Sequence, residues 1–370
     1  MLCDLGKQTH GVAGEILLPS HLKRRCELIR NTVVQFIKAH KTWVLIILPF
    51  LLGVISLTLG RYPISLKDLI SVLVGRIAAL DHGLPSVMET VILEMRLPRI
   101  LAAIMVGGAL SVAGSSYQGI FNNPLTSPDI LGATAGASFG AAIAILMSWN
   151  VLPIQIISFL SGLAAVSITC IISSRIRQSN RVIILVLTGL LTGSVFNSLV
   201  SLVKYTADPY NKLPAISFWL LGSLSSVRMG DVLFLAVTCL ISLIALYLMR
   251  WNLNVLTFGD DEAQTLGVNT RRTRLFVILF STLLTGSSVA ITGVIGWVGL
   301  IVPHLARMLV GPGYQRLLPA SFFIGAAFLL AVDTISRVLF PVEVPLGVLT
   351  SLIGAPFYIY LLARPRRSYK

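Results

Sequence analysis

The sequence is poor in charge, and above all in acids. Of its 370 residues only 12% are charged, with 15 Asp or Glu against 29 Lys or Arg. An ordinary soluble domain carries about 25% charged residues. Together with 55% apolar residues and a mean hydropathy of +0.86, this scarcity excludes a soluble globular protein and indicates a polytopic membrane protein.

Cysteine, histidine and nucleotide-binding motifs are also scarce. The four cysteines, Cys3, Cys26, Cys170 and Cys239, lie too far apart for a disulfide framework or a C-x-x-C metal site. Five histidines are too few and too scattered for the converging acid, base or metal ligands of a membrane-embedded enzyme. No G-x-x-x-x-G-K-[ST] loop is present, so we expect no catalytic residues, no metal ligands and no ATP hydrolysis by this chain.

Apolar stretches separated by Pro, Gly, Asn and charged residues divide the chain into segments that match a membrane span of about 20 residues. This pattern predicts an all-α polytopic membrane protein with ten transmembrane helices. The expected spans are 42–60, 97–120, 130–149, 153–174, 182–203, 230–250, 273–293, 296–310, 318–339 and 346–363.

The distribution of basic residues predicts the orientation of these spans. With the N-terminus in the cytoplasm, the inner segments carry 20 of the 29 Lys and Arg, as the positive-inside bias requires. Nine or eleven spans would place the two basic ends of the chain on opposite sides. We therefore expect a cytoplasmic tail at 1–41, a ten-span domain at 42–363 and a basic cytoplasmic tail at 364–370. The net charge of +14 then faces anionic lipid and requires no nucleic acid.

One charged segment, residues 258–274 (FGDDEAQTLGVNTRRTR), interrupts the apolar pattern on the cytoplasmic side. Three consecutive acids favour the start of a short helix, and Gly267 favours its end. Three arginines follow, where the chain enters the next span. A solvated loop with topology-setting arginines is the alternative, and it accounts less readily for the acids. The acids are Asp260, Asp261 and Glu262, and the arginines are Arg271, Arg272 and Arg274.

Small residues at four-residue spacing predict close helix packing in two spans. The second span carries Gly107, Ser111, Ser115 and Gly119, and the third carries Gly132, Gly136 and Gly140. The turn between these spans, 122–129, contains two asparagines and two prolines, as a capped turn would. Gly293, Gly296 and Gly299 follow no strand, so they indicate a break between two spans.

Several motifs in this order and spacing resemble a known family. They are Arg96-Leu97-Pro98-Arg99 and Asn123-Pro124-Leu125 around the second span, GDDEA and LGV in the charged segment, GWVGLIVPH at 296–304, and VPLGV at 344–348 leading to GAP at 354–356. Over residues 42–363 the chain resembles the FecCD-type (type II) permease subunits of binding-protein-dependent ABC importers for iron-siderophores, haem and cobalamin.

The resemblance implies a complex in the bacterial inner membrane. Two permease subunits, identical or paralogous, would stand on two ATP-binding cassette subunits that use ATP and Mg, and a periplasmic binding protein would deliver the cargo. This chain would bind no cofactor itself. The expected cargo is a ferric siderophore, with haem, cobalamin or an oxyanion as alternatives. An ion-driven secondary transporter is a further alternative, but it needs its own coupling site at the midplane. The candidates for such a site inside the predicted spans are Asp333, near an outer boundary, and His304, close to the inner end of the eighth span, so the sequence argues against it.

On the outer face, the resemblance implies that Arg96, Arg99 and Arg337 receive acidic side chains of the binding protein, with Pro98 stiffening the turn between the first two. The fork of an arginine matches a carboxylate. The alternatives are anchoring to lipid headgroups, or internal pairing with Glu94, Asp333 or Glu343. We interpret the mixed charges of the preceding outer segment as an ordinary solvated loop.

On the inner face, the resemblance makes the charged segment the loop that seats on the ATPase. The predicted coupling residues are Gly259, Asp260, Asp261, Glu262, Ala263, Leu266, Gly267, Arg271 and Arg272. The cargo path would be lined by spans five and ten and by a short outer helix at 213–222. The predicted path and gate residues are Asn122, Asn123, Pro124, Leu125, Asn197, Ser198 and Ser201.

Overall fold

The computed structural model describes residues 43–60, 62–78, 85–176, 181–339 and 342–363. These residues form helices and connecting turns, with no strand among them. The predicted tails 1–41 and 364–370 lie outside the described residues. Contacts divide the chain into two units, 1–44 and 45–370, and the features below belong to the second.

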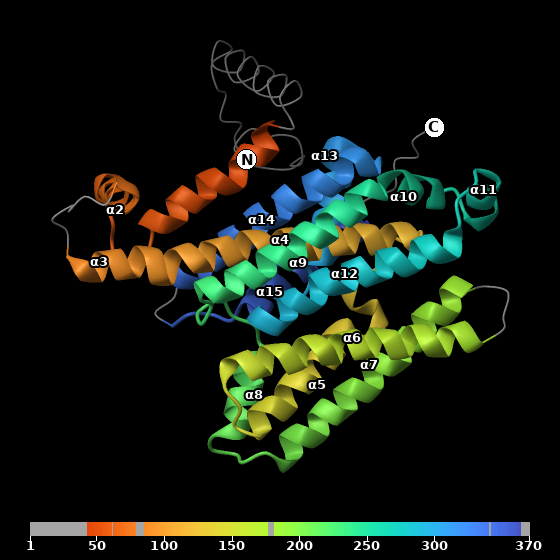
Figure 1. Cartoon of the computed structure of the whole chain (residues 1–370), viewed down its shortest axis with the longest axis horizontal. Coiled ribbons are helices and arrows are strands. Elements are labelled where there is room, and N and C mark those ends of the chain that lie inside the picture. The colour runs from red at the N-terminus through yellow and green to blue at the C-terminus, as the bar shows by residue number, and fades with distance from the viewer. Residues whose placement is uncertain (1–42, 61, 79–84, 177–180, 340–341, 364–370) are drawn as a thin grey trace, which may run out of the picture. The chain divides into compact units, whose positions relative to one another are not determined.

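The helices follow one another with short connections (Figure 1). A first helix at 43–58 precedes the labelled ones. The others are α2 Leu66–Ala78, α3 Ser86–Thr90, the π-helix η2 Val91–Arg96, α4 Leu97–Ile120, the 3-10 helix η3 Pro128–Leu131, α5 Ala133–Leu146, α6 Val151–Arg175, α7 Arg181–Thr206, α8 Lys212–Leu220, α9 Met229–Leu248, α10 Arg250–Leu256, α11 Asp260–Thr265, α12 Thr270–Thr292, α13 Val298–Val310, α14 Tyr314–Val338 and α15 Leu346–Ala363.

Apolar helices occupy every predicted span. Among the described residues, six helical stretches are long and apolar enough to cross a membrane. Four shorter apolar helices accompany them, at Trp43–Thr58, Ala133–Leu146, Val298–Val310 and Leu346–Tyr360. Each of the ten predicted segments overlaps one of these helices, so the all-α polytopic architecture is confirmed, while the number of membrane crossings stays a prediction.

The outer segment before α4 corrects two interpretations. α3, η2 and α4 form one continuous helical stretch, Ser86–Ile120, so Arg96 and Arg99 lie within a helix and do not flank a stiff turn. Pro98 has no N–H to donate, and the wider π-helical turn immediately before it accommodates this loss. Buried Met88 and Ile92 explain why this stretch folds onto the helical core instead of forming a solvated loop. A second helix in the same outer segment, α2, adds to the correction.

α4 lies at the centre of the helical unit, packed against α9, α12, α13 and α14 (Figure 1). Its small residues permit this closeness, as predicted. A Cβ added at Gly107 would lie 2.2 Å from the carbonyl oxygen of Gly325 in α14. One added at Gly119, also in the predicted pattern, would lie 2.3 Å from the hydroxyl oxygen of Tyr314 in α14. Gly114 lies outside that pattern, and a Cβ there would lie 1.8 Å from the carbonyl oxygen of Gly299 in α13. The predicted seam is confirmed, since backbones in contact leave no room for a side chain.

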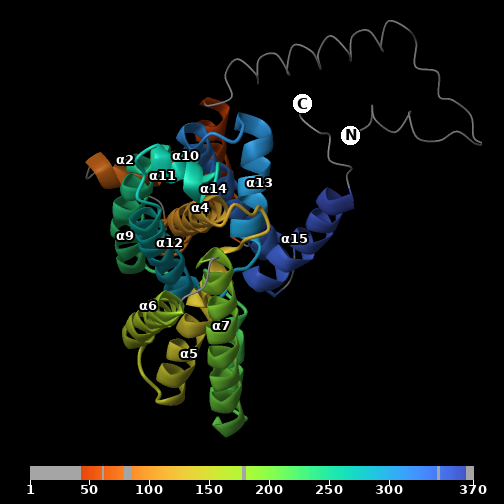
Figure 2. The same cartoon turned by 90° about the vertical axis from the view of Figure 1, so that its right-hand side faces the viewer.

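α5, α6 and α7 pack together as a second group, seen at the bottom of Figure 2. Here too the predicted glycines make the contact. A Cβ at Gly136 would lie 2.7 Å from the carbonyl oxygen of Ser161, and one at Gly140 would lie 2.6 Å from that of Ile157. Gly132 has a positive φ of +83° and ends η3 immediately before α5. The second seam therefore joins α5 to α6.

The predicted break between the seventh and eighth spans is a non-helical stretch from Gly293 to Trp297, between α12 and α13. Backbone hydrogen bonds tie this region to two other helix ends. Ser223 N donates to Thr292 O at 2.7 Å, and Leu346 N donates to Gly222 O at 2.9 Å. Irregular backbone in a membrane protein needs such partners, because lipid offers none.

Candidate functional site

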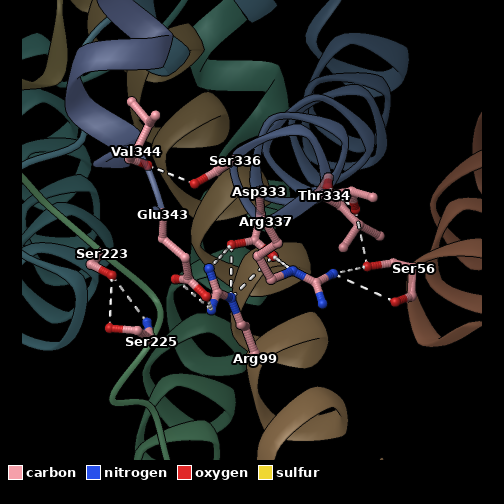
Figure 3. Close-up of polar contacts among 11 residues, drawn as sticks. Ser56, Arg99, Ser223, Ser225, Asp333, Thr334, Ser336, Arg337, Glu343 and Val344 are labelled. Carbon is pink, nitrogen blue, oxygen red and sulfur yellow. Dashed lines mark hydrogen bonds and ion pairs between the residues drawn. The ribbon is translucent and has the colours of Figure 1, made fainter. Parts of the chain in front are cut away.

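Two of the three arginines predicted for the outer face share one buried acid, Asp333 (Figure 3). Arg99 donates from Nε to Asp333 at 2.9 Å, and its Nη1 lies 3.0 Å from Glu343. Arg337 lies 3.2 Å from the other oxygen of Asp333 and donates to Ser56 Oγ at 2.5 Å. The fully buried carboxylate of Asp333 therefore stands between two guanidinium groups. Internal pairing, one of the alternatives from the sequence, is what this chain shows for these two arginines.

Arg96 differs from the other two, because within the described ranges its hydrogen-bond acceptors are backbone carbonyls and not acids. It donates to Leu57 O at 2.5 Å and to Tyr62 O at 2.6 Å. Only 6% of its surface is exposed, and Arg99 and Arg337 are each 8% exposed. Among the described residues, Asp333 and Glu343 thus pair with Arg99 and Arg337, while Arg96 is held by backbone carbonyls.

The charged segment 258–274 folds as predicted. α11 begins at Asp260, directly after Gly259 with φ +114°. It ends at a Schellman motif, in which Gly267 has φ +79° and Val268 N donates to Ala263 O at 2.9 Å. The prediction of a short helix that starts at the acids and stops at Gly267 is confirmed.

α11 has an anchored side and a free side. Ala263 and Val268 are buried in the hydrophobic core. Asp261, Glu262 and Leu266 are exposed, and Leu266 retains 55% of its surface. Arg271 and Arg272, at the start of α12, are exposed as well. The segment therefore presents acids, an apolar side chain and basic residues to the outside from a fixed base.

The turn after α4 is capped, as its composition indicates. Asn122 has φ +47° and Asn123 N donates to Gln118 O at 3.1 Å, again a Schellman motif. Asn123 Oδ1 accepts a hydrogen bond from Leu125 N at 2.9 Å. Pro124 and Leu125 are exposed. Because Asn122 Nδ2 donates to Thr257 O at 3.3 Å, this turn lies against the connection between α10 and α11.

A cavity of about 680 Å³ runs along α7. The predicted path residues Asn197, Ser198 and Ser201 lie in its wall, whereas the predicted gate turn does not. The hydroxyls of Ser198 and Ser201 donate to carbonyls of their own helix at 3.0 Å. The lining includes no residue of α15, the predicted tenth span. Its full lining is Asp129, Ile130, Gly132, Thr134, Ala135, Ser138, Gly189, Leu190, Gly193, Ser194, Asn197, Ser198, Val200, Ser201, Leu220 and Val294.

The predicted short outer helix is α8, and its attachment is polar. The connection before it is an Asx turn, in which the backbone amide of Tyr210 and the side chain of Asn211 hold the pKa of Asp208 below its usual value. Lys212 at the start of α8 donates to Ile145 O at 3.3 Å, at the end of α5. α8 is thereby fastened to the helix that forms one wall of the cavity.

Sequence reasoning missed two side chains that organise these regions. Ser56, on the first helix, accepts a hydrogen bond from Arg337. Arg274 forms a bidentate ion pair with Asp260. Neither contact has a helical spacing in the sequence, so neither was detectable from periodicity. Among the described residues, no group of three His, Cys, Asp or Glu side chains is placed to hold a metal ion.

Comparison with known proteins agrees with the geometry. The molybdate import system permease MolB of Haemophilus influenzae is 39% identical over 85% of this chain and 93% of its own length. A probable iron chelatin transport permease of Helicobacter pylori is 35% identical over 88% of this chain and 99% of its own length. A solved metal-chelate type ABC transporter in an inward-facing conformation superimposes with a TM-score of 0.79, at 38% identity, over 88% and 99% of the two chains.

The family comparison covers the whole helical unit. The FecCD transport family matches residues 46–364, which include the arginine network, the cavity and the charged segment 258–274. The chain therefore belongs to the FecCD transport family, whose members are the permease subunits of ABC importers.

Proposed function

We propose that this chain forms a ten-span permease of the bacterial inner membrane, with both termini in the cytoplasm, and that it imports a metal chelate of the ferric siderophore class. It works with a second permease subunit, two ATP-binding cassette subunits and a periplasmic binding protein. The observation that carries this proposal is the cavity along α7, together with the exposed face of α11.

The size of the cavity favours a chelate over a small oxyanion. Ligand sites for organic molecules span about 300–1,000 Å³, and this cavity measures about 680 Å³. Its walls offer hydroxyls and an amide, and Asp129 is the one ionisable residue among those that line it. A wall without basic residues favours weak contact, so that the cargo is released easily. Molybdate is the second candidate, favoured by the identity to MolB.

A competition experiment tests the cargo class. Purified binding protein and the reconstituted complex are given ferric hydroxamate, ferric catecholate, haem, cobalamin or molybdate as radiolabelled cargo. The proposal expects ATP-dependent uptake of one ferric chelate that excess unlabelled molybdate does not inhibit. If molybdate alone is taken up, molybdate replaces the ferric chelate as the proposed cargo.

The exposed face of α11 supports contact with the ATPase. Asp261, Glu262 and Leu266 point away from the core that holds Ala263. Changing these three exposed residues to Ala removes the contact surface and retains the fold of the helix. We expect less ATPase to copurify with the triple variant than with a Gln315→Ala control, which changes an exposed residue of α14.

The charge of Arg96, whose hydrogen-bond acceptors within the described part of the chain are backbone carbonyls, supports docking of an acidic binding protein. Arg96→Gln removes the charge, and because its side chain is shorter and ends in one amide nitrogen, it cannot keep both donations to Leu57 O and Tyr62 O, so assembly of the variant is checked first. We expect the variant to reduce the stimulation of ATP hydrolysis by the binding protein, because a guanidinium that meets a carboxylate adds a charge-assisted pair. Lys67→Gln, an exposed change in α2, is the matched control. Equal stimulation in both variants would remove Arg96 from the docking surface.

A further inference from the structure

Arg274, in α12, joins the ends of two other helices. Its Nη1 and Nη2 donate to the two oxygens of Asp260 at 2.7 and 2.5 Å, and its Nε donates to Ile120 O at 3.3 Å. Asp260 is the first residue of α11, and Ile120 is the last residue of α4. One guanidinium therefore bridges a cytoplasmic helix and the central helix of the fold.

The electrostatics of both helix ends favour this bridge. The carbonyl end of a helix carries a partial negative charge that a cation stabilises, and an acid is stabilised at the amino end. Arg274 lies at the carbonyl end of α4, and Asp260 lies at the amino end of α11. The parallel two-bond geometry adds orientation as well as attraction. The side chain of Arg274 is 15% exposed and that of Asp260 is 39% exposed, so solvent screens the pair only in part.

The neighbouring arginines show that this role is specific. Arg271 and Arg272 are exposed, whereas Arg274 is turned inward against α4 and α11. The positive-inside bias requires only basic residues on this side, and any of the three would meet it. It does not require one of them to hold two helix ends together.

Other contacts converge on the same end of α4. Asn122, directly after α4, donates to Thr257 O at 3.3 Å. Asn254 of α10 accepts from Tyr314 N at 2.9 Å, and the hydroxyl of Tyr314 donates to Ser115 O in α4 at 3.0 Å. The α10–α11 segment is thus bonded to the last two turns of α4 and to the turn that follows them, through polar contacts far apart in the sequence.

We infer that Asp260 and Arg274 form a clasp that carries movement of α11 into the end of α4 and the adjoining turn at 122–128. Arg274 is a positioning residue: it holds α11 at a fixed place relative to α4. The inference rests on the proposed function, in which the exposed face of α11 meets the ATPase. Without the clasp, α11 moves with the ATPase but α4 does not move with α11. Less cargo is then transported for each ATP hydrolysed.

The test compares clasp variants in the complete complex, reconstituted in proteoliposomes with its ATPase and binding protein. The measured quantity is cargo transported per ATP hydrolysed. Arg274→Ala is expected to lower this ratio at least about fivefold, the lower end of typical coupling between sites. Arg274→Lys keeps the charge and loses the fork, so its ratio falls between those of Arg274→Ala and the wild type. Arg316→Ala, an exposed arginine on the same side, is the control that keeps the wild-type ratio.

The double variant Asp260→Asn with Arg274→Ala gives the decisive comparison. If the two side chains act through their mutual contact, the double variant lowers the ratio no further than Arg274→Ala alone, whereas additive losses of the two single variants overturn the clasp. Hydrogen exchange of the α11 amides supplies a readout that needs no transport. Arg274→Ala should accelerate exchange at residues 260–266 and Arg316→Ala should not; equal protection in both overturns the inference. If the wild-type complex shows no ATP-driven uptake, the proposed function is overturned. The hydrogen-exchange measurement would still show whether Arg274 holds α11 in place.

Discussion

The buried carboxylate of Asp333 gives the sharpest stability prediction. Asp333→Asn keeps the shape of the side chain and removes the charge that Arg99 and Arg337 share. Removal of one partner from a buried ion pair costs about 3–5 kcal/mol, because the other charge stays buried without compensation. Arg99 retains Glu343, which places the expected loss near the lower limit, about 3 kcal/mol.

The matched control is Glu343→Gln, which removes the other acid that contacts Arg99. The side chain of Glu343 is 37% exposed, whereas that of Asp333 is fully buried. A pair of this exposure contributes at most about 1 kcal/mol. The two variants should therefore differ by about 2 kcal/mol, roughly 30-fold in the unfolding equilibrium.

Thermal unfolding in detergent, followed by size-exclusion chromatography of the heated samples, measures this difference. With about 2–4 °C per kcal/mol for a chain of this order of size, Asp333→Asn should lower the midpoint by roughly 6–12 °C and Glu343→Gln by a few degrees at most. Equal unfolding midpoints for the two variants would refute the reasoning, because the burial of the carboxylate would then not determine how much stability is lost.

Three further predictions follow from the packing and the cavity. Gly114→Ala should prevent stable assembly, since its Cβ would lie 1.8 Å from Gly299 O, whereas Gly230→Ala, with open space around it, should express as the wild type does; yield after size exclusion decides between them. Ser198→Phe should fill the cavity and lower cargo uptake while the ATPase still copurifies, as uptake and pull-down would show. Ser56→Ala removes an acceptor of Arg337 and should cost about 1–3 kcal/mol, visible as a lower unfolding midpoint than that of Ser226→Ala, an exposed control in a turn.

Much of the fold could be predicted from the sequence, because a lipid bilayer requires apolar spans of a set length and small residues where helices pack closely. Continuous apolar stretches marked the spans, and small residues at four-residue spacing marked the seams of α4 and α5. The acids and Gly267 predicted α11, since helix ends favour those residue types locally. Each of these signals is local, and each depends on few neighbours.

The rest depends on contacts between distant residues. The stretch before α4 was predicted as a loop because it carries charges, yet Ile92 and Met88 bury one of its faces. Arg274 was interpreted as a topology signal, and its partner Asp260 lies 14 positions away in another helix. The partners of Arg99 lie more than 230 positions away, so only the folded chain shows which acid it meets.

The central claim is that a separate ATPase drives transport through this chain. The most direct measurement is uptake of a radiolabelled ferric siderophore into proteoliposomes, with the ATPase present or absent and with either ATP or a proton gradient supplied. We predict uptake only with the ATPase, the binding protein and ATP together. Uptake by the permease alone under a proton gradient would contradict the account and would identify a secondary transporter.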